Sequence, residues 1–480
     1  MKNIESTNKY LIGIVLLFVL RGFLNAYVPL MDKTEARYAE IARIMEETNN
    51  WITPQIDYGV PFWAKPPLST WLSALSIKTF GVNEFAVRFP YLIISAILVI
   101  VISRFAKDKK FTLFTGFVLL TIPEFFLHAG VVSTDMFLSF CVVMIFLTFW
   151  KAIESDRFTF WGYLIFLFIG LGLLAKGPIV LILTVPPILI WIVYYGHFKK
   201  VLKILPLFSG CILSLVIAIP WYYLAEVETK GFLEYFIFGE HFNRFFDSNW
   251  DGDKYGFAKT QPFGIIWLFL FVFAFPWIII LLIQLWKNKK DLLQNNWVFF
   301  LLLWLLWTPI FFTFSSSLIH PYIMPSMIPI ALLLEYYWKT IQNKKTAILL
   351  SLIFPILIIL ITILSFLSNN LEFYSKTDKF LLSNTEYFPN EIYYLGNKSY
   401  SSQFYTEGKI KNISTENLKI KLNSKDEFHI IIENKKLDQI DSSILKKLKL
   451  LNFNKFSGIY EKKEKTNKSK STFINEIFYD

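Results

Sequence analysis

The stretch that most constrains the fold is Asp32-Lys33-Thr34-Glu35-Ala36-Arg37-Tyr38-Ala39-Glu40, a charged segment set between apolar runs. It follows directly on the apolar run 10–29 and precedes a second polar motif, Phe62-Trp63-Ala64-Lys65-Pro66-Pro67. Charge concentrated between membrane-length apolar runs belongs outside the hydrocarbon. The segment therefore marks an extramembrane loop that either anchors the chain or carries its chemistry.

The composition is that of an integral membrane protein. Of the 480 residues, 54% are hydrophobic and 18% aromatic, and the mean hydropathy is +0.46, which exceeds what one soluble core buries. Runs of about 20 apolar residues can cross a bilayer as helices. We count eleven such runs: 10–29, 86–104, 111–130, 136–151, 158–174, 178–196, 202–224, 263–286, 297–314, 321–338 and 346–367. Cys141 and Cys211 lie inside these runs, which predicts no disulfide framework.

Basic residues are sorted by loop, so the net charge of +11 indicates topology and not a nucleic-acid partner. When the eleven runs are threaded alternately, the lysine and arginine clusters share one side, which we assign to the cytoplasm together with the N-terminus. The opposite, periplasmic side receives 30–85, 131–135, 175–177, 225–262, 315–320 and the segment from 368. We expect a multi-pass protein of the inner (cell) membrane with the Asp32–Glu40 segment outside.

The chain is predicted to have a membrane domain over 1–368 and a soluble domain after it. In the first external loop, 30–85, apolar spacing predicts two interfacial helices, over 34–47 and 68–80. The loop 225–262 is rich in aromatic and charged residues and is predicted to form a lid or wall. The fold class is thus all-α and multi-pass, followed by a small external α/β domain.

The C-terminal domain is expected over 369–461, where Lys, Asn, Ser, Glu and Ile dominate. Strands are predicted at 392–395, 428–432 and 457–460, and a helix over 441–451 that begins at an Asp N-cap. The basic tail 462–480 is predicted to be disordered.

Asp32 and Glu35 have two interpretations that can coexist. Their spacing is that of a capping box at the start of the helix over 34–47. A carboxylate held rigidly at a helix start also suits a general base, so both residues are candidate catalytic groups.

Other polar residues map to the same external face. Lys65 is held by a stiff Pro-Pro segment and suits a phosphate, although it also fits a lysine that reaches lipid headgroups. Asp135 opens the run 136–151 and suits a helix cap. Lys176, in a tight external turn between two runs, needs a partner such as Asp135 or a ligand.

The last candidates come from later loops. His241 and Arg244 are three residues apart and share one helix face; Arg244 suits a phosphate or carboxylate, and His241 suits a metal or a hydrogen bond. Tyr322 opens the run 321–338, where it also fits the aromatic belt. A transporter would concentrate ionisable residues near mid-membrane, whereas here they gather on one face.

The motifs resemble those of the aminoarabinose transferase and protein mannosyltransferase superfamily of GT-C glycosyltransferases. The first loop is the most specific part of the resemblance. The matching stretches are Asp32–Ala39, Phe62–Pro67, Phe80–Pro90, Asp135-Met136, Lys176-Gly177-Pro178, Glu240–Phe245 and Tyr322–Pro325.

The resemblance implies an enzyme that moves a sugar from a polyprenyl-phosphate carrier to a lipid, glycan or protein acceptor; direct displacement at the anomeric carbon would then predict inversion. It implies that Asp32 is the catalytic or acceptor-positioning residue and that Lys65 contacts the carrier phosphate. Arg244 and Tyr322 are implied to help in these roles. No cofactor is required. Relatives that modify lipid A carry Glu before that Lys as a metal ligand beside a His like His241; Ala64 stands there in this chain, which argues against both the metal and an aminoarabinose substrate.

Two other classes of function fit the same sequence. A lipid-linked sugar flippase or other transporter would also have many spans and a polar external mouth. A membrane scaffold would act through its C-terminal domain.

Overall fold

We describe a computed structural model of the chain, which covers residues 2–108, 111–247, 250–256, 260–368, 370–383 and 391–463. The chain divides into two compact units. The first comprises Met1–Val28 and Thr34–Leu364, and the second comprises Pro29–Lys33 and Ser365–Asp480. The short segment that contains Asp32 thus belongs with the C-terminal part of the chain.

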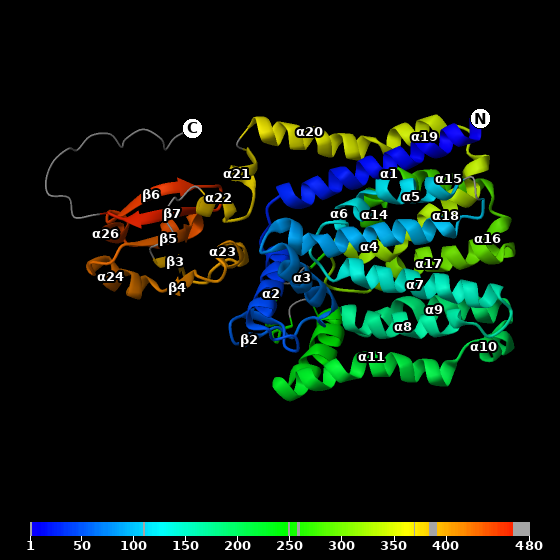
Figure 1. Cartoon of the computed structure of the whole chain (residues 1–480), viewed down its shortest axis with the longest axis horizontal. Helices are drawn as coiled ribbons and strands as arrows, with labels where there is room; N and C mark the ends of the chain where they lie inside the picture. Colours follow the sequence, from blue (N-terminus) through cyan, green and yellow to red (C-terminus); the bar gives the residue numbers. More distant parts are fainter. Residues whose placement is uncertain are drawn as a thin grey trace. The chain divides into compact units, whose positions relative to one another are not determined.

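The first unit is built of helices, with a single small hairpin in its described part (Figure 1). Its elements are α1 (Lys2–Tyr27), α2 (Thr34–Thr48), β1 (Gln55–Asp57), β2 (Val60–Pro61), α3 (Leu68–Phe80), α4 (Glu84–Arg104), α5 (Thr112–Thr121), α6 (Pro123–His128), α7 (Asp135–Glu154), α8 (Phe160–Lys176), α9 (Ile179–Tyr194), α10 (Phe198–Ile204), α11 (Leu207–Glu228), α12 (Phe232–Glu234), η2 (Tyr235–Asn243), α13 (Arg244–Phe246), α14 (Ile265–Phe273), α15 (Trp277–Lys287), α16 (Asp291–Gln294), α17 (Asn296–Phe312), η3 (His320–Ser326), α18 (Met327–Tyr337), η4 (Trp338–Thr340), α19 (Lys344–Ser351) and α20 (Ile353–Leu367).

All eleven predicted apolar runs contain helix, which confirms a multi-pass helical membrane protein. Among the described residues, five helical stretches are long and apolar enough to cross a bilayer, and the bent pair α14–α15 would make a sixth. Four shorter apolar helices accompany them. Breaks explain the difference from eleven: Pro123 begins a new helix after α5, and the chain turns by 101° between α14 and α15. The count of eleven spans stays a prediction.

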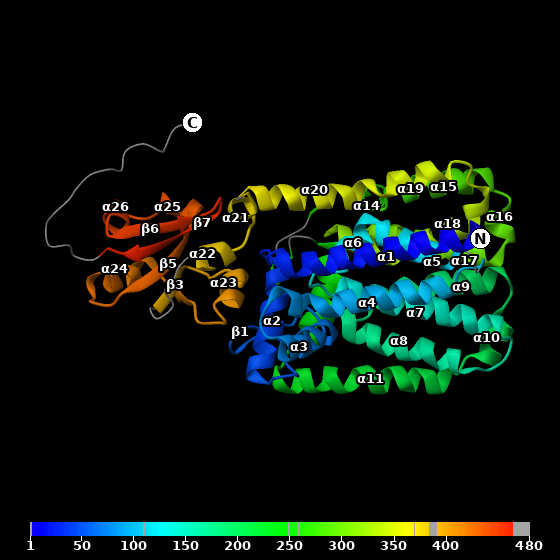
Figure 2. The same cartoon turned by 45° about the horizontal axis from the view of Figure 1, so that its top comes forward.

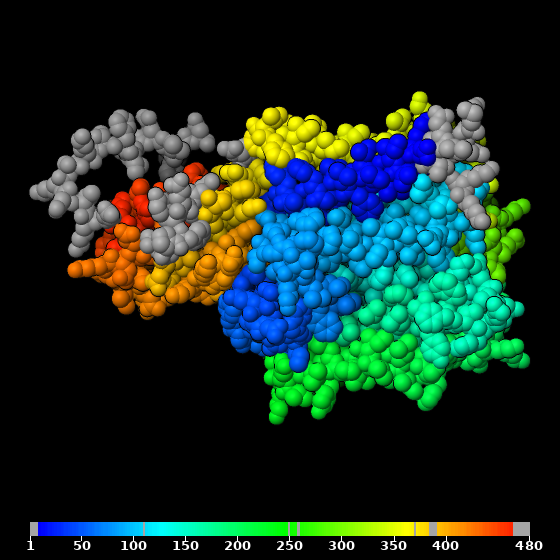
Figure 3. Space-filling model, in the orientation of Figure 1, coloured from blue at the N-terminus to red at the C-terminus, as the bar shows by residue number. Residues whose placement is uncertain are grey.

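The long helices of the first unit lie side by side. Figures 1 and 2 both show α4, α7, α8 and α11 as neighbours, and on the face seen in Figure 3 side chains close the space between α1 and α4. The interior is aromatic: Phe146 of α7 stacks on Trp304 of α17 with ring centroids 4.4 Å apart. Helices α11 and α20 expose many large apolar side chains, as expected of helices that face lipid.

The two helices predicted in the first loop are present as α2 and α3, with the hairpin β1–β2 between them. Charged residues of α2 are buried as well as its apolar ones. Glu40 and Arg43 are both buried, and Arg43 Nε donates to Glu40 Oε2 at 2.8 Å. Helix α2 is therefore packed on more than one side.

The second unit contains a mixed sheet in the order β4-β3-β5-β7-β6. Strand β3 is parallel to β4 and β5, whereas β7 is antiparallel to β5 and β6. Its described elements are α21 (Asn370–Tyr374), α22 (Lys379–Ser383), β3 (Glu391–Leu395), α23 (Tyr400–Tyr405), β4 (Lys411–Ile413), α24 (Thr415–Asn423), β5 (Phe428–Glu433), α25 (Asn434–Leu437), α26 (Ser442–Leu445), β6 (Leu448–Phe453) and β7 (Ser457–Lys462). Alternate residues of β3 and β5 feed two apolar clusters, one on each face of the sheet.

The strands predicted at 392–395, 428–432 and 457–460 correspond to β3, β5 and β7. The helix predicted over 441–451 is wrong beyond its first turn. Asp441 does cap a helix, accepting from Ser443 N–H at 2.8 Å, but that helix ends at Leu445 and Leu448–Phe453 pairs with β7 as a strand. Of the predicted disordered tail, Lys462 ends β7, and 464–480 lies outside the described residues.

Candidate functional site

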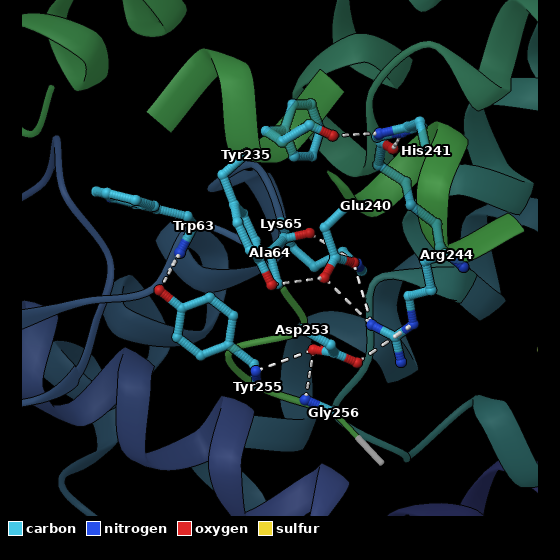
Figure 4. Close-up of polar contacts among 12 residues, drawn as sticks. Trp63, Ala64, Lys65, Tyr235, Glu240, His241, Arg244, Asp253, Tyr255 and Gly256 are labelled. Atoms are coloured by element: carbon cyan, nitrogen blue, oxygen red, sulfur yellow. Dashed lines mark hydrogen bonds and ion pairs between the residues drawn. The ribbon is translucent and has the colours of Figure 1, made fainter. Parts of the chain in front are cut away.

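A buried carboxylate joins two cations in the first unit. Lys65 Nζ, in the loop between β2 and α3, donates to Glu240 Oε2 at 2.6 Å, and Arg244 Nη1 lies 3.2 Å from both oxygens of Glu240. The Glu240 side chain is only 2% exposed. Figure 4 shows the two cationic side chains reaching this carboxylate from different elements. We call Lys65, Glu240 and Arg244 the cation centre.

Local backbone geometry brings these residues together. Lys65 is followed by Pro66 and Pro67, which restrict the chain just before α3. Glu240 and His241 lie on η2, a nine-residue π-helix; this rare geometry is frequent at functional sites. Arg244 follows directly, at i+4 from Glu240.

The charges of the cation centre reinforce one another. Burial opposes ionisation of Glu240, but Lys65 and Arg244 outweigh it and hold the pKa of this carboxyl below its usual range. Burial likewise works against the Arg244 cation, yet Glu240 leaves the Arg244 pKa above its usual value. Asp253 lies 3.9 Å from Arg244 Nε and accepts the N–H groups of Tyr255 and Gly256. The centre is thus an ionised, ordered arrangement.

A second ion pair adjoins the cation centre. Lys176 Nζ donates to Asp135 Oδ1 at 2.5 Å and lies 4.3 Å from the centroid of the Tyr322 ring. This confirms the expectation that Lys176 can bridge to Asp135. His241 links the two groups, because its Nε2 lies 3.3 Å from the backbone oxygen of Lys176. Six of the predicted site residues therefore come together in the first unit: Lys65, Asp135, Lys176, His241, Arg244 and Tyr322.

Glu35 has a different partner from the one its spacing predicts. Its oxygens accept two hydrogen bonds of 2.8 Å from Arg88, and Oε1 also accepts the Val132 N–H at 3.3 Å. The capping-box interpretation is therefore wrong. Arg88 also donates to the backbone oxygen of Asn25 at 3.0 Å, so the pair ties α2 to α4 and to the end of α1.

Asp32 lies in the second unit. Its carboxylate accepts the backbone N–H of Ser401 at 3.1 Å and the Ser401 hydroxyl. Helix α2 begins at Thr34, so Asp32 is not its N-cap. Burial, followed by the charge of Asp378, raises the pKa of Asp32 to about 7, although the hydrogen bonds from Ser401 act in the opposite direction.

Ala64 and His241 do not form the metal site that the resemblance implies. Ala64 has no ligand atom in its side chain. Both ring nitrogens of His241 face backbone oxygens, Nδ1 that of Phe236 at 2.8 Å and Nε2 that of Lys176 at 3.3 Å. Burial also keeps the pKa of His241 below its usual value. These residues fit a structural link between loops and do not fit a metal.

Sequence reasoning did not select Glu240 or Arg88. Glu240 precedes His241 and stands at i−4 from Arg244, a spacing typical of a helical ion pair. The pairing of Glu240 with Arg244 could therefore have been predicted from the sequence. The pairing of Glu240 with Lys65 spans 175 residues. Arg88 lies in the Phe80–Pro90 stretch that carries the resemblance, but its partner Glu35 is 53 residues away.

Residues 11–236 match the model of the dolichyl-phosphate-mannose-protein mannosyltransferase family. An undecaprenyl phosphate-alpha-4-amino-4-deoxy-L-arabinose arabinosyl transferase from Enterobacter sp. (strain 638) is 28% identical over 341 residues, 70% of this chain and 59% of that protein. The corresponding transferase from Erwinia tasmaniensis is 28% identical over 335 residues, 67% of this chain and 59% of that protein. The chain thus spans 59% of the length of these two relatives.

The fold is also similar to a solved structure. The crystal structure of ArnT from Cupriavidus metallidurans bound to undecaprenyl phosphate superposes with a TM-score of 0.71 over 95% of this chain and 98% of that chain, at 14% identity. At this identity the likeness concerns the fold.

Proposed function

We propose that the chain is a GT-C glycosyltransferase that transfers a sugar from a polyprenyl-phosphate carrier to an acceptor; its similarity to aminoarabinose transferases and to the protein mannosyltransferase family supports this. The observation that carries the proposal is the cation centre. Lys65 and Arg244 converge on the carboxylate of Glu240, and Asp253 lies 3.9 Å from Arg244 Nε. A carrier phosphate binds here by competing with these carboxylates for the two cations.

Lys65 and Arg244 bind the carrier phosphate and stabilise it as the leaving group. Arginine offers a planar fork and lysine a compact charge, and both match phosphate oxygens. Developing negative charge on the bridging oxygen is stabilised by cations already in place. Glu240 orients both cations before the carrier arrives.

The transfer step is a displacement at the anomeric carbon. An acceptor oxygen forms a bond to that carbon while the bond from the carbon to the phosphate oxygen breaks, and polyprenyl phosphate leaves with the electron pair. The acceptor hydroxyl gives up its proton to a general base; the resemblance assigns this role, or the orientation of an acceptor that is itself a phosphate, to Asp32. Single displacement inverts the configuration at the anomeric carbon.

The remaining site residues position groups around this step. The sugar lies beside Lys176 and the ring of Tyr322. Lys176 forms an ion pair with Asp135. Glu35 is a positioning residue, since Arg88 occupies its oxygens. The reaction requires no cofactor.

We assign the donor to polyprenyl phosphates such as undecaprenyl phosphate, carrying a pentose or a hexose. The acceptor is a lipid, glycan or protein on the external face. The protein lies in the inner membrane with eleven spans, a cytoplasmic N-terminus, and its active site and C-terminal α/β domain in the periplasm. Ala64 separates its sugar specificity from that of the aminoarabinose transferases.

The test is transfer by the purified chain in detergent. Undecaprenyl phosphate carrying a radiolabelled sugar is mixed with lipid, glycan and protein acceptors extracted from cells that lack the chain. Label in an acceptor, with release of undecaprenyl phosphate, supports the enzyme. Detergent offers no membrane to cross, so carrier movement across liposomes without transfer in detergent would favour a flippase instead.

A further inference from the structure

A second cluster of polar side chains lies in the first unit, in a different set of elements from the cation centre. Glu124 and His128 are four residues apart on α6 and share one face. His320 begins η3, nearly two hundred residues later. One ligand atom from each of the three residues lies within 4.8 Å of the other two.

The carboxylate stands between the two imidazoles. His320 Nδ1 lies 2.9 Å from Glu124 Oε2, and His128 Nε2 lies 3.0 Å from Glu124 Oε1. The ring centroids of the two histidines are 5.5 Å apart. A tetrahedral metal ion with nitrogen and oxygen ligands at about 2.0–2.1 Å holds those atoms roughly 3.3 Å apart, so small side-chain shifts bring all three donors into place.

The surroundings of the His128 side chain point to a bound metal ion. His128 is 3% exposed; its Nδ1 has no hydrogen-bond partner in the described part of the chain, and its Nε2 has Glu124 as an ion-pair partner. The 3.0 Å separation of Nε2 from Glu124 Oε1 is an ion-pair distance. A buried imidazole with an unsatisfied nitrogen is costly, and a metal ion held by the ring and by Glu124 offsets part of that cost.

The surroundings suit a metal that enters from outside. The Glu124 side chain is fully buried, whereas the His320 side chain is 38% exposed and offers a route in. The ring of Phe273 stacks on His320 at 4.4 Å, and such an apolar wall fixes the imidazole. In the predicted topology, this cluster lies toward the external end of its helices.

We propose that Glu124, His128 and His320 bind a divalent transition-metal ion, with Zn²⁺ as the expected occupant. Two imidazoles and one carboxylate are a usual zinc set, which leaves the fourth position open to water. The ion joins α6 to η3, the element that also carries Tyr322. This site is separate from the one that Ala64 and His241 would form.

The test measures zinc in the full-length chain, purified in detergent without a histidine tag. The protein is stripped with a chelator, incubated with Zn²⁺, desalted and analysed by mass spectrometry of the metal. We expect about one zinc per chain and a melting temperature that rises with free Zn²⁺.

Variants locate the ion. His128→Gln, His320→Gln and Glu124→Gln should each weaken zinc binding by more than about tenfold and remove the zinc-dependent rise in melting temperature. His197→Gln and His241→Gln are the matched controls and should keep the wild-type zinc content. If His128→Gln does not fold, His320→Gln replaces it as the test variant, because the His320 ring is partly exposed. Co²⁺ bound to the wild type should give a visible absorption band that His320→Gln lacks.

Two results would overturn the site. One is a wild-type chain that retains less than about a tenth of an equivalent of zinc. The other is zinc that survives in both His320→Gln and His128→Gln, or is lost only in His241→Gln.

Discussion

Two buried carboxylates, Glu240 in the first unit and Asp32 in the second, have pKa values shifted in opposite directions. Glu240 faces the cations Lys65 and Arg244, which hold its pKa below the usual range in spite of burial. Asp32 faces the hydroxyl and N–H of Ser401 and the charge of Asp378, and its pKa is raised to about 7. Burial raises the pKa of both carboxylates, and at Glu240 the neighbouring cations outweigh it, whereas Asp32 has no such cation contact strong enough to do so.

The difference suggests a division of labour. A carboxylate that stays ionised can order two cations before a phosphate arrives, and this is the role proposed for Glu240. A carboxylate with a pKa near neutrality can take and release a proton under physiological conditions, and this is the role proposed for Asp32. Asp378, whose pKa is also raised by burial, places a second proton-holding group in the same unit.

The largest expected effect concerns the pH dependence of stability in the second unit. Folded Asp32 keeps its proton up to about pH 7, whereas an unfolded Asp releases it near pH 3.9. The folded state therefore binds more protons, and its free energy of unfolding falls as pH rises from about 4 through about 7. The shift corresponds to roughly 4 kcal/mol. Hydrogen exchange of residues 391–405, corrected for the intrinsic rate, measures it.

Asp32→Asn should flatten that dependence, because the amide does not titrate. Ser401→Ala removes the hydroxyl that donates to Asp32 but keeps the backbone N–H, and should raise the pKa of Asp32 further. Equal pH dependence in wild type and Asp32→Asn would show that Asp32 is not the titrating group.

The next effect is on transfer. Lys65→Ala or Arg244→Ala leaves the buried Glu240 with one cation and removes one phosphate contact, so the rate should fall by about 10²–10³-fold, or about 3–4 kcal/mol. Initial rates at saturating acceptor measure the loss. Lys230→Ala changes an exposed lysine in the external loop that also carries Arg244, and it serves as the control. A rate within about threefold of wild type in Lys65→Ala would remove Lys65 from the phosphate site.

A smaller effect, of opposite sign, is expected for Glu240→Gln. The glutamine keeps the shape of the side chain but no longer competes with phosphate for the two cations. Polyprenyl phosphate should bind about tenfold more tightly, a change of about 1.4 kcal/mol, while the rate of the transfer step falls because the cations are less ordered. Weaker carrier binding in this variant would contradict the competition.

The smallest effect is expected for His241→Gln. The imidazole contributes contacts to two backbone oxygens, those of Phe236 and Lys176, so its loss should cost about 1 kcal/mol of stability. Thermal unfolding in detergent measures this cost. A loss of bound metal in His241→Gln would instead revive the metal role of this residue.

Local signals predicted much of the fold. The helices α2 and α3 follow from apolar spacing and from Pro66-Pro67, and the strands β3, β5 and β7 follow from β-branched and aromatic runs. The prediction of a helix over 441–451 is wrong because Leu448–Phe453 pairs with β7 as a strand. Pairing with a neighbouring strand overrode the local helical spacing.

The candidate site was predicted in its members but not in its contacts. Lys176 with Asp135 was foreseen because a lysine beside two membrane-length runs needs an anion. The partners of Lys65, Glu35 and Asp32 are 175, 53 and 369 residues away along the chain. Such pairings depend on the tertiary fold, which residue spacing does not contain.

The most direct test of the account is binding of undecaprenyl phosphate to the cation centre, measured by native mass spectrometry of the detergent-purified chain. The wild type and Lys230→Ala should each hold about one carrier per chain. The double variant Lys65→Ala, Arg244→Ala should hold almost none while its melting temperature remains measurable. Equal occupancy in the wild type and in a folded double variant would contradict the assignment of this centre to the carrier phosphate.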